Sequence, residues 1–240
     1  MRVPHTWRVL AAVIPLFLTA LLTGVGCSDS DDPNGGGGGS GNPVGLGAAS
    51  SFGVLAGLSV SNSGATTINA DLGIWPGSTL TGAPTVTGTT HLGDVPAQNA
   101  QGALTAAYND AAGRAAGSTI AGDLGGLTLA PGVRKSTSTL AITSADVTLD
   151  GGGNSNAVFI FQIASSFTVD VGRQVILVNG AQPSNIFWQV GSSATLNTNC
   201  SVSGNILALT TISMGTGATL NGRALARNGS VTLLANTVTP

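Results

Sequence analysis

The chain has 240 residues, of which 42% are hydrophobic, 4% aromatic and 8% charged, and it contains 36 glycines. Its formal net charge of −2 provides no basic patch that would attract nucleic acid or anionic lipid. The composition also differs from that of a disordered chain, which is poor in apolar residues and rich in charge. Many small residues and few aromatic ones favour a solenoid with tight corners, and we expect no cofactor.

The N-terminal segment has the pattern of an export signal. Residues 1–26 begin with basic residues, continue as an apolar run and end in small residues. The apolar run is too short to span a bilayer securely, so a cleaved secretory signal is favoured over the alternative, a transmembrane anchor. The residues before Cys27 resemble a bacterial lipobox, although Gly24 stands where that motif usually has Leu. We therefore expect Cys27 to be lipidated.

The next segment predicts a tether. Residues 28–43 are acidic and then glycine-rich, with no apolar side chain to bury. We expect an anchor and flexible tether over 27–43 and one folded domain over 44–240. The protein would then be exported, as a membrane-anchored lipoprotein facing the periplasm or the cell exterior, or otherwise as a secreted protein. Its only membrane contact would be this lipid anchor.

The folded part begins with strands and one helix. Over residues 50–94, short apolar runs are separated by Gly, Asn and Pro, which predicts strands and turns. Over residues 95–116, apolar residues instead recur at steps of three and four, with Asp94 and Pro96 at the start and Gly117 at the end. This predicts an amphipathic helix of about six turns. Its alanine-rich stripe can lie close against a flat apolar surface.

Two later segments, VFIFQI at 158–163 and NIFWQV at 185–190, are apolar on both strand faces. Such strands are buried on both sides, so we expect one side to fill a solenoid interior and the other to receive the helix. Each is followed by a strand with one apolar face, as at 166–170 and 193–197, and then by a third strand. An earlier set of the same kind ends in TLAIT at 139–143. Three strands per coil predict a mostly β fold, a triangular β-solenoid.

The second strand of each coil places polar, uncharged residues on its outward face. The expected main column is Thr143, Thr168, Thr195, Ser213 and Thr232. Their partners, two residues earlier, are Ala141, Ser166, Ser193, Thr211 and Ser230. Strands stack ~4.7–4.9 Å apart, and alternate residues along a strand are about 6.6–6.8 Å apart. The columns therefore predict a flat grid of hydroxyl and methyl groups, interrupted by alanine at one partner position.

Several motifs resemble those of the bacterial and fungal ice-binding (antifreeze) family. They include AYNDAAGR at 107–114, NIFWQVGSSATL at 185–196 and TLNGRALARNGSVTL at 219–233. The resemblance covers essentially all of 46–239. It implies a right-handed, three-faced β-solenoid with one long α-helix packed along one side and another flat face that binds ice. The ice-binding strands of that family correspond to those directly after the doubly apolar strands.

The resemblance implies a monomer whose partner is the ice surface and whose adsorption gives thermal hysteresis and inhibits recrystallisation. A rigid, uncharged grid can order its first water layer into an ice-like arrangement. The residues expected at the ice are Thr143, Ser166, Thr168, Ser193, Thr195, Thr211, Ser213, Ser230 and Thr232. The resemblance also implies that N-terminal strands, with Leu58 and Ser59, lie beside the last coil and complete the face.

Two other classes of protein compete with this interpretation. A polysaccharide-active β-helix enzyme needs clustered carboxylates or a catalytic base. The Asp residues are scattered among Gly and Thr, and the sequence contains no nucleophile–base motif or metal-ligand spacing, so we do not expect an enzyme. A cell-surface adhesin or structural solenoid that binds sugar or protein remains an alternative, because exposed Thr is common on strands for its strand propensity alone.

Overall fold

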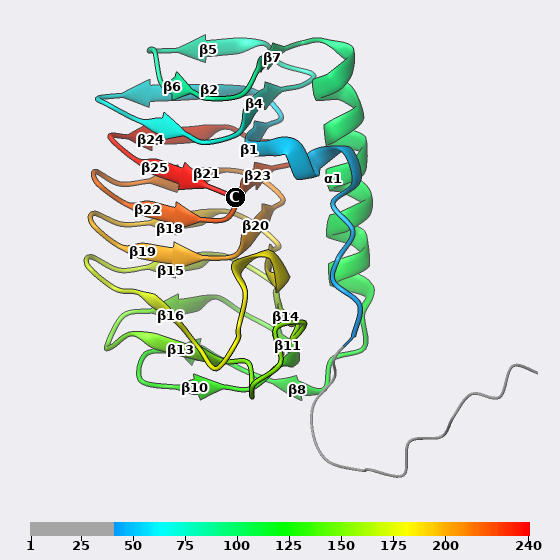
Figure 1. Cartoon of the computed structure of the whole chain (residues 1–240), viewed down its shortest axis with the longest axis vertical. Helices are drawn as coiled ribbons and strands as arrows, with labels where there is room; N and C mark the ends of the chain where they lie inside the picture. Colours follow the sequence, from blue (N-terminus) through cyan, green and yellow to red (C-terminus); the bar gives the residue numbers. More distant parts are fainter. Residues whose placement is uncertain (1–40) are drawn as a thin grey trace, which may run out of the picture. The chain divides into compact units, whose positions relative to one another are not determined.

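The computed structural model describes residues 41–240 (Figure 1). The expected signal peptide (1–26), Cys27 and most of the expected tether lie outside the described residues. The described part forms a β-solenoid in which every strand pairing is parallel. Its coils have three sides, and the handedness of the coil stays a prediction. None of the described helices is long and apolar enough to cross a membrane.

The first side, called the helix-side sheet, has nine strands. In spatial order they are β7 (Thr90–Leu92), β4 (Asp71–Ile74), β1 (Phe52–Ala56), β23 (Ala224–Ala226), β20 (Asn205–Ala208), β17 (Ile186–Val190), β14 (Phe159–Ile163), β11 (Gly132–Ser136) and β8 (Ser118–Thr119). Two short 3-10 helices precede strands of this sheet: η1 (Gly47–Ser51) and η2 (Pro183–Asn185).

The second side, called the hydroxyl sheet, has eight strands. In spatial order they are β5 (Thr79–Thr81), β2 (Ser59–Ser63), β24 (Val231–Leu234), β21 (Ile212–Met214), β18 (Ala194–Leu196), β15 (Phe167–Val169), β12 (Leu140–Ile142) and β9 (Gly122–Asp123). Strands β12, β15, β18, β21 and β24 are the singly apolar strands that the sequence predicts.

The third side consists of two sheets. The upper third sheet is β19 (Ser201–Ser203), β22 (Thr219–Asn221), β25 (Thr237–Thr239), β3 (Thr67–Ile68) and β6 (Thr85–Val86). The lower third sheet is β10 (Thr128–Leu129), β13 (Val147–Asp150) and β16 (Val175–Val178). A single bridge between Gln174 and Ser201 joins the two.

The N-terminal strands do not start the stack but cover its C-terminal end. Strand β1 pairs with β23, β2 with β24 and β3 with β25, so the blue and cyan strands lie above the red ones in Figure 1. Helix α1 (Val95–Gly113) then carries the chain along the solenoid to its other end, where β8 begins. The expectation that N-terminal strands lie beside the last coil is confirmed.

Helix α1 is shorter than the sequence predicts. Its first turn is capped by Asp94, whose carboxylate accepts a hydrogen bond from the Ala97 amide at 3.0 Å. It ends at Gly113, because Arg114 adopts an extended conformation (φ −68°, ψ 141°). The predicted end at residue 116 is therefore wrong, and Ala115 is exposed outside the helix.

A buried glutamine fixes the C-terminal end of α1. The Gln162 amide nitrogen donates to the carbonyls of Ala111, at 2.9 Å, and Arg114, at 2.7 Å. These contacts satisfy carbonyl groups that have no partner inside the helix. A residue 48 positions away in the sequence therefore binds the end of the helix, and helical periodicity contains no signal of that contact.

The doubly apolar strands are buried on both sides, as predicted. Phe159, Phe161 and Trp188 point into the solenoid core. Their neighbours Ile160 and Phe187 belong to a second buried cluster that also contains the α1 residues Ala100, Leu104, Ala107, Tyr108 and Ala111. The helix-side sheet thus separates two apolar layers, the solenoid core and the contact with α1.

Candidate binding surface

Two columns of small polar side chains run along the hydroxyl sheet. Successive strand residues point to opposite faces, so the buried inward residues determine which residues point outward. The pairing register aligns the first set, called the central column: Thr168, Thr195, Ser213, Thr232, Ser61 and Thr81. Six consecutive strands thus contribute one hydroxyl each to a single line.

The flanking column lies two residues earlier on each strand. It consists of Thr139, Ser166, Ser193, Thr211, Ser230, Ser59 and Thr79. Several of these hydroxyls bond to one another across strands. Ser193 Oγ lies 2.7 Å from Thr211 Oγ1, and Ser59 Oγ lies 2.8 Å from Ser230 Oγ. These contacts restrict the side-chain rotamers along the column.

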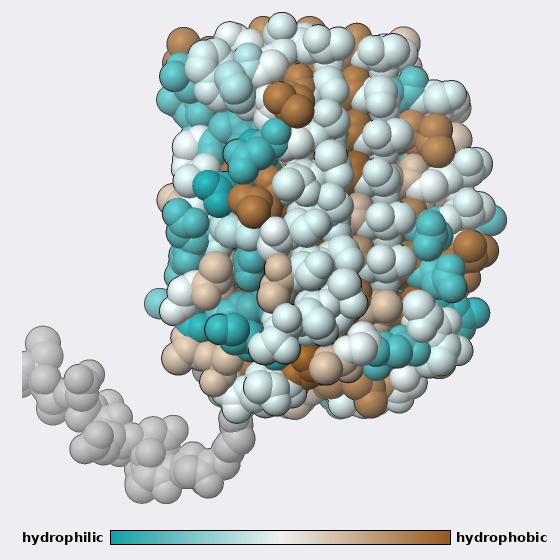
Figure 2. All heavy atoms as spheres, turned by 180° about the vertical axis from the view of Figure 1, so that it is seen from behind, coloured by the Kyte–Doolittle hydropathy of each residue, from teal (hydrophilic) through white to brown (hydrophobic). Residues whose placement is uncertain are grey.

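The two columns form a continuous surface. Viewed from this side, the molecule shows two parallel files of weakly polar residues, and strongly hydrophilic residues gather towards the edges (Figure 2). Among the predicted residues, Ser166, Thr168, Ser193, Thr195, Thr211, Ser213, Ser230 and Thr232 lie on this surface. The structure therefore brings together eight of the nine residues expected there.

Thr143 is the exception, and its expected place in the central column is wrong. Ala141 pairs with Thr168, so alanine occupies the central column and Thr143 lies two residues further along, beside Asp170. The residue beside Ser166 on the adjacent strand is then Thr139 and not Ala141. A shift of two residues leaves the inward and outward faces unchanged, so alternation alone cannot detect it. The pairing of Leu140 with Phe167 in the core fixes the actual register.

Part of the surface was not predicted from the sequence. Strands β2 and β5 extend both columns with Ser61, Thr79 and Thr81. The expected addition of Ser59 agrees with its place in the flanking column, whereas Leu58, 57% exposed, lies at the corner between two sheets. The alternation in SVSNS and TLT was the available signal, but it extends over only three to five residues.

A carboxylate marks the lower end of the central column. Asp123 pairs with Ala141 and accepts hydrogen bonds from the amides of Gly125, Thr143 and Ser144, each at 2.9 Å. Hydrogen bonds from Ser144, and then from the Gly125 and Thr143 amides, hold the pKa of this carboxyl far below its usual range. The uncharged part of the column therefore ends at Ala141.

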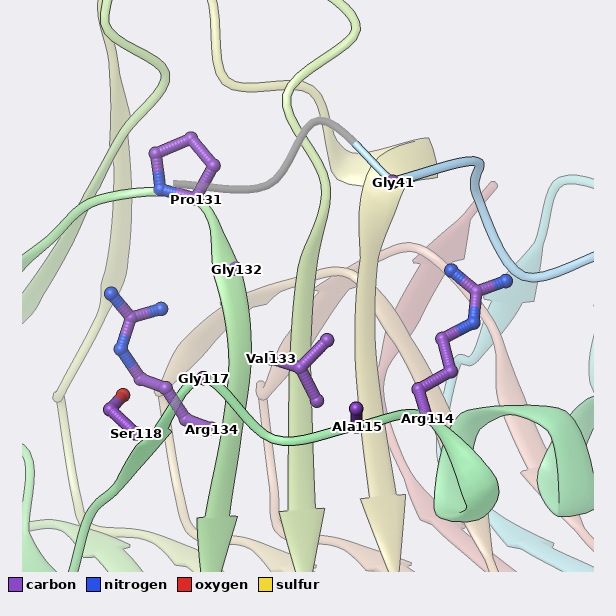
Figure 3. A pocket seen from close by; sticks show the side chains of 9 residues that line it. All are labelled: Gly41, Arg114, Ala115, Gly117, Ser118, Pro131, Gly132, Val133 and Arg134. Atoms are coloured by element: carbon purple, nitrogen blue, oxygen red, sulfur yellow. The ribbon is translucent and has the colours of Figure 1, made fainter. Parts of the chain in front are cut away.

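Two features outside the hydroxyl sheet were candidates for chemistry, a cavity and a cysteine. A cavity of about 590 Å³ lies at the foot of α1, with Arg114 and Arg134 on opposite sides of Val133 (Figure 3). Its lining contains no acid and no cysteine. Within residues 41–240, no group of three His, Cys, Asp or Glu side chains could hold a metal ion. Burial raises the pKa of the Cys200 thiol to about 11, so this thiol is unreactive near neutral pH.

The fold and this surface define a class of protein: a parallel β-solenoid that presents aligned columns of uncharged hydroxyl side chains on one side. The chain matches the family model described as "Ice-binding-like" over residues 54–239. It therefore belongs to the ice-binding-like family.

Curated relatives agree with this assignment. An ice-binding protein of Nostoc sp. (strain HG1) is 46% identical over 197 residues, which cover 80% of this chain and 72% of the relative. An ice-binding protein of Flavobacterium frigoris (strain PS1) is 38% identical over 216 residues, which cover 82% of this chain and 76% of the relative.

Solved structures also share the fold. An ice-binding protein from an Antarctic biological consortium aligns with a TM-score of 0.82 and 51% identity, covering 83% of this chain and 91% of that one. An ice-binding protein from the Antarctic ascomycete Antarctomyces psychrotrophicus aligns with a TM-score of 0.79 and 40% identity, covering 82% and 98%.

The hydrogen bonds to the Asp123 carboxylate predict that the stability of the folded protein depends on pH. The pKa of the Asp123 carboxyl is depressed in the folded state. Its contribution to the stability of the folded protein is therefore present above the unfolded-state pKa of about 4 and is lost as the pH falls through the folded-state pKa. Asp123→Asn should therefore lower the melting temperature near pH 7, and the difference from wild type should shrink in acid. Thermal unfolding at both pH values measures it.

Asp170→Asn is the matched control for this experiment, because the Asp170 carboxylate accepts only the amide of its neighbour Val171. This variant should stay close to wild type. A melting-temperature difference for Asp123→Asn that did not change between neutral and acidic pH would contradict the linkage.

Proposed function

We propose that this protein adsorbs to ice through the central and flanking columns of the hydroxyl sheet, giving thermal hysteresis and inhibiting recrystallisation. The observation that carries the proposal is the register. Six strands from both ends of the chain align hydroxyl-bearing residues without a single charged side chain between Thr168 and Thr81.

The spacing of this grid explains how it acts on water. Strands are ~4.7–4.9 Å apart and outward residues along a strand about 6.6–6.8 Å apart, so the two columns form a regular two-dimensional grid. Thr is stiff at χ1 because it is β-branched, and cross-strand hydroxyl contacts restrict Ser193, Thr211 and Ser230 further. Water above the grid is held in fixed positions that can merge with a growing crystal, whose front then curves between adsorbed molecules and slows.

Membership of the ice-binding-like family supports a binding role and not catalysis. The relatives from Nostoc and Flavobacterium frigoris are both ice-binding proteins. We further propose that the protein acts as a monomer, because its exposed large apolar residues, such as Leu58, Val95 and Val171, lie on different strands, helices and corners.

Where the protein acts depends on its N-terminal segment. The basic start, apolar run and small residues before Cys27 support export, and the lipobox-like sequence supports lipidation. The acidic and glycine-rich residues up to 43 support a tether. A lipid-anchored domain could hold the cell to ice or protect its envelope, whereas a secreted one would modify the surrounding brine.

The main test replaces Thr195 with tyrosine, which projects a ring from the middle of the central column. Wild type should be incorporated into slowly growing ice and show thermal hysteresis, and Thr195→Tyr should lose most of that hysteresis. Thr148→Tyr, on the lower third sheet, is the matched control and should resemble wild type. Wild type that stayed wholly in the liquid would overturn the proposal and favour an adhesin or structural solenoid.

A second test separates the observed register from the one that periodicity predicts. Ala141→Thr adds a hydroxyl and a methyl to the central column directly below Thr168, so it should raise thermal hysteresis. Thr143→Val should leave hysteresis unchanged, because Thr143 lies outside both columns. The opposite ranking of the two variants would show that the active column runs through Thr143.

Lipidation is tested separately by Cys27→Ala, which should release the protein from the membrane fraction into the medium or the soluble periplasm. Globomycin, which blocks processing of lipidated precursors, should cause the wild-type precursor to accumulate. If wild type were already soluble and insensitive to globomycin, the anchor would be absent, and the ice-binding proposal would stand unchanged.

A further inference from the structure

A groove along one flank of helix α1 carries aromatic and cationic side chains that the hydroxyl sheet does not use. Its volume is about 410 Å³, and its walls come from α1, from the corner after β4 and from the corner after β23. We propose that this groove binds an acidic polysaccharide, whose sugar rings carry carboxylate groups. No residue that lines it belongs to the central or the flanking column, so the inference goes beyond the proposed function and does not depend on it.

The cation of the groove is Arg227, at the corner after β23. Its guanidinium carbon lies 4.7 Å from the centre of the Tyr108 ring, within the range of a cation–π contact. Tyr108 is 8% exposed, and its hydroxyl donates to the Val190 carbonyl at 3.4 Å. Stacking covers a face of the planar guanidinium and leaves the N–H groups in its plane for other partners. Arg227 is therefore held in place without the use of its donors.

No acid of the described chain neutralises Arg227. The ion pairs within residues 41–240 are those of His91, Arg114 and Arg173, and the described residues that line the groove include no acid. The Nε atom of Arg227 is buried without a hydrogen-bond partner. A buried donor that stays unpaired is costly, and a carboxylate matches the paired N–H groups of a guanidinium. The missing partner thus points to a ligand that brings its own carboxylate.

The other groove residues suit the rest of a sugar ring. Trp75 is half-buried and forms part of the wall at the corner after β4. An indole ring offers a large apolar face, on which the C–H groups of a pyranose can pack. Gln98 and Asn228 are exposed and Thr105 is half-buried. Their amide and hydroxyl groups both donate and accept hydrogen bonds, as sugar hydroxyls require. One apolar platform with a few polar groups around it is typical of a ligand site.

The groove is formed before any ligand arrives. Gln101, 7% exposed, donates from its amide nitrogen to the Ala226 carbonyl at 3.1 Å. This contact ties α1 to the end of β23, directly before Arg227, and holds the two walls at a fixed separation. A preformed site binds without the entropic cost of ordering its walls.

A second depression follows the same helix towards its C-terminal end. Its volume is about 240 Å³, and Tyr108, Ala112 and Lys135 contribute to its lining. None of the ion pairs within residues 41–240 involves Lys135, and the described lining again includes no acid. The helix rises ~21 Å from Gln98 to Ala112 at 1.5 Å per residue. An extended polymer with repeated carboxylates therefore meets a cation in each depression, whereas a single sugar occupies only one.

Polysaccharide binding here would leave the ice-binding surface free. The groove lies beside α1 and the helix-side sheet, and the central and flanking columns lie on the hydroxyl sheet. One molecule could then hold an acidic polysaccharide and ice at the same time.

The experiment titrates the full mature chain with a hexamer of galacturonate, and with a hexamer of glucose as the neutral comparison, by calorimetry at low and high salt. Arg227→Gln removes the cation of the groove, and Arg173→Gln, beside the lower third sheet, is its matched control. Gln98→Glu adds a negative charge inside the groove. Asn99→Glu adds the same charge at the next residue of α1, which is exposed and does not line the groove.

We expect wild type to bind the galacturonate hexamer, more weakly at high salt, and to bind the glucose hexamer much less. Arg227→Gln and Gln98→Glu should each weaken binding about tenfold, and the two control variants should match wild type. If Arg227→Gln failed to fold, the comparison of Gln98→Glu with Asn99→Glu would still decide, because both positions are exposed.

Three results would overturn the proposal: no binding by wild type, equal binding of the two hexamers, or equal losses in Gln98→Glu and Asn99→Glu. Thermal hysteresis is measured on the same proteins and should be unchanged in all four variants. Failure of the polysaccharide site would therefore leave the ice-binding proposal standing, and loss of hysteresis in wild type would leave the titration result standing.

Discussion

The structure depends on the stacking of inward apolar residues between parallel coils. On the hydroxyl sheet, Leu140, Phe167, Ala194, Ile212, Val231 and Val60 form one inward column, and all are fully buried. Burying such a side chain stabilises by about 1.5–3 kcal/mol, whereas a hydroxyl–hydroxyl hydrogen bond contributes about 0.5–1.5 kcal/mol net. Core packing therefore sets the register, and the outward hydroxyls take whatever alignment the core imposes.

Helix α1 explains why strands from both chain ends share these sheets. Its 19 residues span ~28 Å at 1.5 Å per residue, and the nine strands of the helix-side sheet span about 38 Å at 4.8 Å per step. The helix and the extended residues after it thus carry the chain from one end of the stack to the other. The later coils stack from β8 towards the N-terminal strands, with which β23, β24 and β25 pair. The last coil therefore has no open edge that could attract another chain.

Core packing sets the register and the outward hydroxyls follow it, and this difference determines what could be predicted from the sequence. Doubly apolar strands such as β17 and the alternation of β15, β18 and β21 identify the core and the outward face directly. The position of Thr143 could not be predicted, because corner insertions permit a two-residue shift that preserves alternation. Strands β3, β6 and β25 are two or three residues long, too short to show a period. That Thr67 and Thr237 lie side by side on one sheet appears only once β3 and β25 are paired.

The placement of charge follows the same logic. Asp123 and Asp150 bind backbone amides in the lower coils, and Asp146 lies 3.6 Å from Arg173 beside the lower third sheet. These ionic groups satisfy loops where the coils carry insertions and the backbone needs partners. The tight coils over residues 191–222 contain no charged residue, because each strand there finds its partners in the next coil. Because the corners of these coils carry no charged residue, the strands between them present only hydroxyls, methyls and amides to the adjacent water.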